Sequence, residues 1–113
     1  MWYKGEMLIE LQPTNAYSKH HVAFTKTELN AILSVYSFQV AKGHWRDYAI
    51  DFTKTMAMFS IYRHAHETPL ASIVKLPANT ASGFVFEVFF ERKRLSRSAD
   101  LSRALDALRE TFI

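Results

Sequence analysis

The chain has 113 residues, with 14 Lys and Arg against 11 Asp and Glu, so its net charge of +3 permits an acidic partner without requiring one. A composition that is 49% hydrophobic and 14% aromatic excludes a disordered chain, and the length suits one domain. The absence of cysteine excludes disulfides, thiolate metal sites and cysteine nucleophiles.

The start of the chain differs from the rest. Residues 1–21 have no regular pattern apart from a short apolar run at 7–11 that predicts a strand. We therefore expect an N-terminal extension over residues 1–21 and a single domain over residues 22–113. No segment has the apolar core of a signal peptide or the roughly 20 apolar residues of a membrane span. We expect a cytoplasmic protein with no membrane partner.

A capping box at Thr25-Lys26-Thr27-Glu28 predicts the start of the first helix. In such a box the Thr25 hydroxyl accepts a hydrogen bond from the backbone amide of Glu28, and the Glu28 carboxylate accepts one from the backbone amide of Thr25. Gly43 predicts its stop after Lys42. The apolar positions between them span a wider arc than one sheet face requires, so this helix is either buried on two sides or offers an apolar flank to a partner. These positions are Leu29, Ala31, Ile32, Leu33, Val35, Tyr36, Phe38 and Val40.

Four strands are predicted next, at residues 48–53, 56–63, 70–76 and 84–91. The connections are short, which favours antiparallel neighbours because parallel pairs need a long crossover. The last of these strands is rich in Phe and would promote aggregation at an exposed edge, so we place it inside the sheet.

The chain ends in an amphipathic helix, which Ser98 is expected to cap with Asp100 in the first turn. The expected fold is α+β with two layers: a helix, a four-stranded antiparallel meander and a second helix.

Several segments resemble a family of small alphaproteobacterial proteins that is catalogued only as a domain of unknown function. The most specific is Gly43-His44-Trp45-Arg46-Asp47-Tyr48-Ala49-Ile50-Asp51, a Gly-x-Trp-Arg-Asp-Tyr-Ala-Ile-Asp block. The resemblance runs from Val22 to the last helix and implies a bacterial cytoplasmic protein, but no activity or cofactor. In the family the second strand ends in basic residues. Arg63 fits this pattern, and His64 differs from it. The other matching segments are Thr25 to Glu28, Leu33 to Tyr36, Phe59 to Arg63 and Pro69-Leu70.

The densest group of functional side chains follows the first helix. Trp45 offers a face for stacking, Arg46 a planar guanidinium, and Asp47 and Asp51 carboxylates to orient it. Arg63 on the neighbouring strand can reach the same carboxylates. The alternative interpretation is structural, because large aromatic residues at the junction of two elements usually serve packing.

A basic run at Arg92, Lys93, Arg94 and Arg97 follows the Phe-rich strand. Basic residues beside aromatic ones can hold phosphates and stack bases, so this run carries the alternative function of nucleic-acid binding. The competing interpretation is a solvated turn before the last helix.

Catalysis and metal binding have little support. His44, Asp47 and Asp51 contain the groups for acid–base chemistry, but no motif joins them. His64 and His66 supply two ligands, and zinc sites usually have three or four. We expect no cofactor and no metal.

The leading hypothesis is a small binding or adaptor domain that contacts a protein, including a second copy of itself. It depends on the wide apolar arc of the first helix and on Met58, Tyr62 and Phe89, which alternation places on the second face of the sheet.

Overall fold

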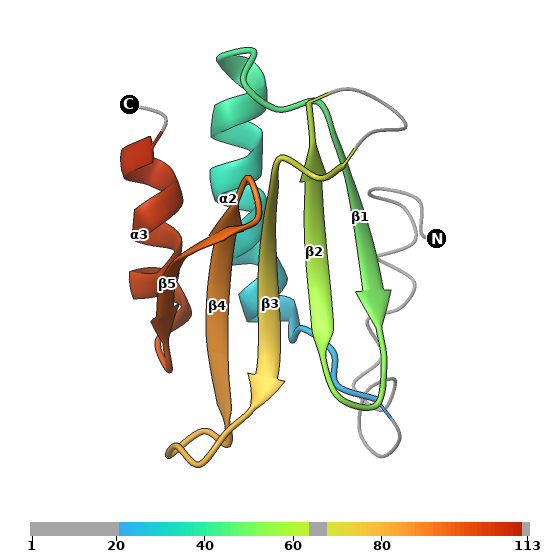
Figure 1. Ribbon diagram of the computed structural model, residues 1–113, viewed down its shortest axis with the longest axis vertical. Coiled ribbons are helices and arrows are strands. Elements are labelled where there is room, and N and C mark those ends of the chain that lie inside the picture. Colours follow the sequence, from blue (N-terminus) through green and yellow to red (C-terminus); the bar gives the residue numbers. More distant parts are fainter. Residues whose placement is uncertain (1–20, 64–67, 112–113) are drawn as a thin grey trace.

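The computed structural model describes residues 21–63 and 68–111, and it confirms an α+β fold (Figure 1). Five strands form one sheet in the order β1-β2-β3-β4-β5, and all neighbours are antiparallel. Both described helices lie on the same face of the sheet. The elements are α2 (Lys26–Ala41), β1 (Asp47–Phe52), β2 (Ala57–Tyr62), β3 (Ala71–Pro77), β4 (Phe84–Phe90), β5 (Lys93–Ser98) and α3 (Leu101–Thr111).

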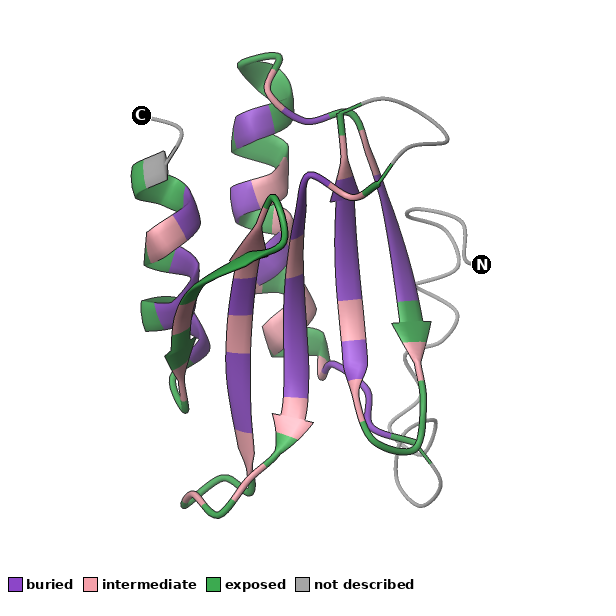
Figure 2. Ribbon diagram, viewed as in Figure 1, coloured by how far each residue is buried: buried purple, intermediate pink, exposed green. Residues whose placement is uncertain are grey.

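The sheet has five strands where four were predicted. The interpretation of the basic run as a solvated turn holds for Arg92 alone: Lys93, Arg94 and Arg97 lie on β5, which pairs with β4 from Phe90↔Lys93 to Phe86↔Ser98. Most of β5 is exposed, so it shows none of the apolar alternation that marks a half-buried strand (Figure 2). β5 also places β4 inside the sheet, which confirms the expectation for the Phe-rich strand.

Both ends of α2 form as predicted. Thr25 Oγ1 accepts from the Glu28 amide at 3.1 Å, and Glu28 Oε1 accepts from the Thr25 amide at 2.8 Å, which completes the capping box. At the other end, Gly43 has φ +82° and its amide donates to Val40 O, while the His44 amide donates to Gln39 O. These two bonds form a Schellman motif, which satisfies carbonyl groups that the helix leaves free.

The start of α3 corrects one prediction. Asp100, not Ser98, caps this helix: Asp100 Oδ1 accepts from the Ser102 amide at 2.9 Å. Ser98 lies earlier and accepts from the Asp100 amide at 3.0 Å. A carboxylate at this position also interacts favourably with the positive end of the helix dipole.

The core lies between the sheet and the two helices. Ile32, Val35 and Gln39 are the buried residues of α2, whereas Val40 and Phe38 are exposed. Leu29, Ala31, Leu33 and Tyr36 are partly buried against the same core, so Phe38 and Val40 are the two positions of the wide apolar arc that remain exposed. From α3 and the strands, the core takes Tyr48, Ile50, Phe59, Ile61, Ile73, Phe86, Val88, Leu101, Ala104, Leu105 and Leu108.

One buried charge joins the layers. Lys75 on β3 is 3% exposed, and its Nζ donates to Glu28 Oε1 at 2.8 Å and to Ala23 O at 2.9 Å. It also lies 4.3 Å from the centre of the Phe84 ring. Glu28 thus receives one charged donor from the sheet and one amide donor from its own capping box. This ion pair ties the start of α2 to the centre of the sheet.

We expect Lys75→Ala to lower the free energy of unfolding by about 3–5 kcal/mol, because removing one partner leaves the Glu28 carboxylate in a largely buried place without its cation. Urea denaturation measures this change. Lys54→Ala, at an exposed turn position, should change it by less than about 0.5 kcal/mol. Equal small effects for both variants would contradict the role given to Lys75.

Candidate functional site

Trp45, the aromatic residue of the predicted binding group, and the nearby Tyr48 lie in the core. Trp45 is 3% exposed and Tyr48 is 7% exposed. Tyr48 stacks on Phe59 with ring centres 4.7 Å apart, and Tyr36 from α2 packs edge-on against Tyr48 at 4.8 Å. The Trp45 ring lies 6.0 Å from Tyr36. These contacts agree with the packing interpretation, because rings so deeply buried offer almost no face to a ligand.

Tyr36 connects this aromatic group to the segment before β1. Its hydroxyl donates to Arg46 O at 2.9 Å. Burial, followed by the nearby Asp47 and Tyr48, raises the pKa of Tyr36 from 10.0 to about 12. Burial and a neighbouring negative charge both disfavour the phenolate.

The remaining predicted site residues do not converge. Asp47 and Asp51 pair with opposite ends of β2, at Tyr62 and Met58, so about 13 Å of strand separates them. Arg46 and Arg63 are exposed, and the described part of the chain contains no ion pair between Arg63 and either carboxylate.

His44 lies at the end of α2, where its Nδ1 is 2.6 Å from Gln39 Oε1. Because Asp51 lies at the far end of β1, the three groups considered for acid–base chemistry do not share one site.

The described residues contain neither a cluster of metal ligands nor a helix that could span a membrane. Among them, no three His, Asp or Glu side chains gather as metal ligands, and His64 and His66 lie outside the described residues, as does the strand predicted at 7–11. Neither α2 nor α3 is long and apolar enough to cross a membrane.

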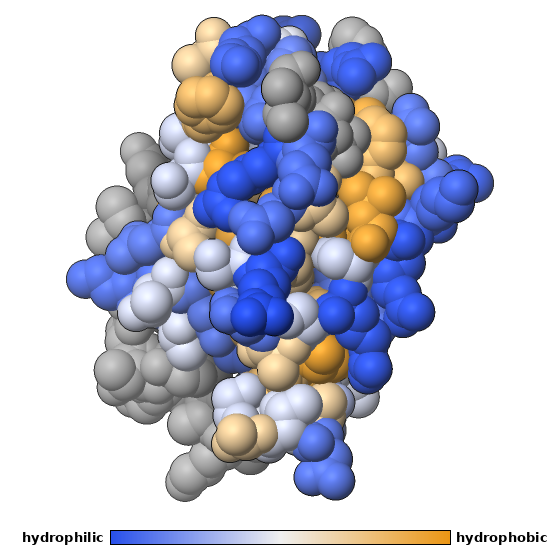
Figure 3. Space-filling view, turned by 90° about the vertical axis from the view of Figure 1, so that its left-hand side faces the viewer, coloured by the Kyte–Doolittle hydropathy of each residue, from blue (hydrophilic) through white to orange (hydrophobic). Residues whose placement is uncertain are grey.

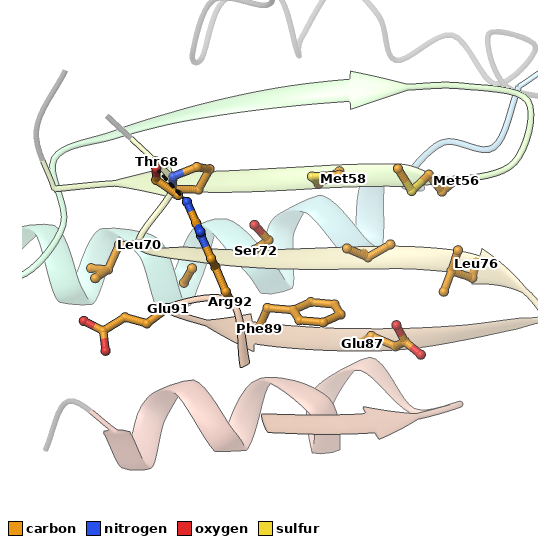
Figure 4. Close-up of a pocket in the computed structure, with 13 residues that line it drawn as sticks. Met56, Met58, Thr68, Leu70, Ser72, Leu76, Glu87, Phe89, Glu91 and Arg92 are labelled. Carbon is orange, nitrogen blue, oxygen red and sulfur yellow. Dashed lines mark hydrogen bonds between the residues drawn. The ribbon is translucent and has the colours of Figure 1, made fainter. Parts of the chain in front are cut away.

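A groove of about 370 Å³ lies on the outer face of the sheet, which is the face opposite α2 and α3 (Figure 4). The side chains there come from β2, β3, β4 and the segments next to these strands, and they include Met58 and Phe89, which alternation placed on this face. The apolar lining residues are Met56, Met58, Pro69, Leu70, Ala71, Val74, Leu76 and Phe89, and the polar ones are Thr68, Ser72, Glu87, Glu91 and Arg92.

The charged groups at the groove differ in how far other residues of the chain pair with them. Glu87 Oε2 accepts from Arg94 Nη1 at 3.2 Å and from Arg97 Nε at 3.0 Å, so this carboxylate is satisfied from β5. Arg92 reaches across the end of β3, and its Nη2 donates to Thr68 Oγ1 at 3.4 Å (Figure 4). The carboxylate of Glu91 points away from the groove in the same view.

The turn that carries Arg92 is strained. Glu91 and Arg92 connect β4 to β5 and have φ angles of 51° and 71°. Positive φ at both central residues is what a type I′ turn requires, and Asn-Gly is the favoured pair there. For other residues this conformation costs about 1–2 kcal/mol each. Neither the composition nor the periodicity of the sequence indicated this turn.

The basic run starts in the turn before β5 and continues along β5. Arg92, Lys93, Arg94 and Arg97 are all exposed, but Arg94 and Arg97 share the Glu87 carboxylate. Figure 3 shows the side of the molecule on which α3 and β5 lie: a hydrophilic ridge runs down its middle with apolar surface on both sides. The Glu87 carboxylate therefore offsets part of the positive charge of the run.

A second hollow, of about 550 Å³, lies between the starts of the two helices. Lys75 and Asp100 line it, but Lys75 is already bound to Glu28 and Ala23 O, and Asp100 caps α3. The charged groups of this second hollow thus already make hydrogen bonds that stabilise the fold. The groove on the outer face of the sheet is therefore the stronger candidate site.

A family model described as a protein of unknown function (DUF2794) matches residues 22–105. This range includes all five strands and every residue of the groove. No curated protein and no solved structure matches the chain.

The raised pKa of Tyr36 predicts a pH effect on stability. Between pH 10 and 12 the unfolded chain releases this proton while the folded chain keeps it. The contribution of Tyr36 to stability is thus complete below pH 10 and is lost as the pH rises toward 12. In urea denaturation, the free energy of unfolding should fall more steeply across this window for the wild type than for Tyr36→Phe. Parallel curves would contradict the assignment.

We expect the double variant Glu91→Asn, Arg92→Gly to be about 0.5–1 kcal/mol more stable than the wild type, since relief of the strain exceeds the added freedom of the unfolded chain. Thermal and urea denaturation measure the difference. Gly83 provides the opposite control: its φ is +88° and no atom blocks an added Cβ, so Gly83→Ala should lower stability through the backbone alone. A double variant that is less stable than the wild type would refute the claim that the turn at Glu91 and Arg92 is strained.

Proposed function

We propose that this chain, which belongs to the DUF2794 family, is a binding domain that docks a protein partner on the outer face of its sheet. The observation that carries the proposal is the apolar groove across β2, β3 and β4. Both described helices lie on the opposite face, so neither of them covers this groove.

The chemistry of the groove supports a protein as the occupant. Met56, Met58 and Phe89 are only half-buried, and methionine and aromatic side chains adapt well to a partner's surface. Polar residues border this apolar floor, in the arrangement of a protein interface with a hydrophobic centre and a polar rim. Contiguous apolar surface of this kind commonly marks an interaction site.

A second apolar surface supports the same class of function. Phe38 is 58% exposed and Val40 is 38% exposed on α2, so this helix also offers apolar contacts. The partner can accordingly be a second copy of the chain. The proposed setting is the bacterial cytoplasm, which the absence of cysteine suits.

Nucleic-acid binding is the alternative function, and the exposure of Arg92, Lys93, Arg94 and Arg97 favours it. It predicts binding that weakens steeply as salt rises, because neutralised phosphates release counterions. The Glu87 carboxylate between Arg94 and Arg97 reduces the positive potential there and makes this alternative the weaker of the two.

The test compares variants of the full chain as bait in the native host. We expect Met58→Asp to lose the partner that the wild type retains, because a carboxylate in the apolar floor would be buried without a cation on binding. Mass spectrometry identifies the partner, and sedimentation velocity detects self-association.

Phe38→Asp is the matched control, since it places the same charge on the other apolar surface. Both variants must retain the circular dichroism of the wild type. Loss of the partner with Phe38→Asp but not with Met58→Asp would move the interface to α2 and overturn the proposal. Salt-sensitive binding of RNA or DNA, unaffected by Met58→Asp, would favour the alternative.

A further inference from the structure

We infer that the protein segment held in the groove is apolar and carries a carboxylate group, which pairs with Arg92. The inference rests on the proposed function and adds the chemistry of the partner. It starts from three observations: the apolar floor, the position of Arg92 at the end of that floor, and the strained turn that holds Arg92 there.

The charges around the groove leave Arg92 as the group for recognition. Glu87 is neutralised by Arg94 and Arg97, and Glu91 points away. The described residues provide no carboxylate to Arg92; its guanidinium makes one long hydrogen bond, of 3.4 Å, to the neutral Thr68 hydroxyl. A guanidinium has five N–H donors in a planar fork that matches a carboxylate. The structure therefore presents donors that a carboxylate complements.

The backbone of the turn supports this role. A type I′ turn is most stable with Asn-Gly, yet the chain has Glu91 and Arg92 with φ angles of 51° and 71°. Strained residues of this kind concentrate at functional sites, where the strain holds a side chain in place. Here the strained turn holds the Arg92 guanidinium over the end of the groove. Glycine at this position would relieve the strain but would place no side chain there.

The open shape of the groove decides between a peptide and a lipid. Met58, Leu76 and Phe89 line it and remain half-buried, so the groove does not enclose its occupant. A small fatty acid would need a cavity that buries most of its surface. A protein segment needs only one side buried, because its other side can remain in water. The carboxylate is thus assigned to an Asp, a Glu or a C-terminus of a protein.

The experiment uses a random-peptide library displayed on phage and panned on the full chain, with counter-selection against Met58→Asp. Selected peptides are synthesised and titrated by fluorescence anisotropy. We expect them to be apolar with at least one carboxylate, and Arg92→Gln should weaken their binding about tenfold or more. Arg103→Gln, at an exposed position on α3, should leave affinity unchanged.

A double-mutant cycle then tests the pair directly. Changing the peptide carboxylate to its amide should cost the same tenfold with wild-type protein and nearly nothing with Arg92→Gln. The variant Glu91→Asn, Arg92→Gly adds a readout that a structural role would not give, because it should fold more stably and bind more weakly.

The outcomes separate the two proposals. Peptides that depend on Met58 but lack a carboxylate, or that bind Arg92→Gln as tightly as the wild type, overturn the carboxylate pairing and leave the groove as the interface. A library that yields no peptide dependent on Met58 overturns both. Displacement of the peptides by RNA at low salt also counts against the pairing, because it assigns Arg92 to phosphate.

Discussion

One buried ammonium group determines how the layers meet. Lys75 rises from the middle strand of the sheet and binds both Glu28 at the start of α2 and the carbonyl of Ala23 before it. Because Glu28 also closes the capping box, the beginning of the helix and its position over the sheet are set by the same carboxylate. From this anchored start, α2 runs so that Tyr36 reaches Tyr48 and Phe59.

This anchoring gives the two faces of the sheet different tasks. The inner face receives both helices and the aromatic group around Tyr36, Tyr48 and Phe59, so its side chains are committed to stability. The outer face keeps Met58 and Phe89 half-buried beside an arginine held by a strained turn. Strain is tolerated there because the rest of the sheet already determines where β4 and β5 lie, and a local cost can persist when its surroundings fix the geometry.

The sequence predicted those elements whose signals are local. The capping box of α2, its glycine stop and the alternation that placed Met58 and Phe89 opposite the helices were all readable from short segments. β5 was missed because its backbone is satisfied by pairing with β4 while its side chains remain in water, so no apolar pattern marks it. The Lys75–Glu28 pair and the reach of Arg92 to Thr68 were also unpredictable, since each joins residues distant in sequence that only the folded sheet brings together.

The basic strand at the end of the sheet has a consequence for how copies of the protein meet one another. An unpaired strand edge is a template on which further chains can add, and a Phe-rich strand at the border would make such growth favourable. Here the outermost strand carries Lys93, Arg94 and Arg97, and its register shifts where it passes Val88 and Phe89. Two β5 edges brought side by side would place cation against cation on strands distorted by a bulge, which opposes the pairing of two copies through this edge.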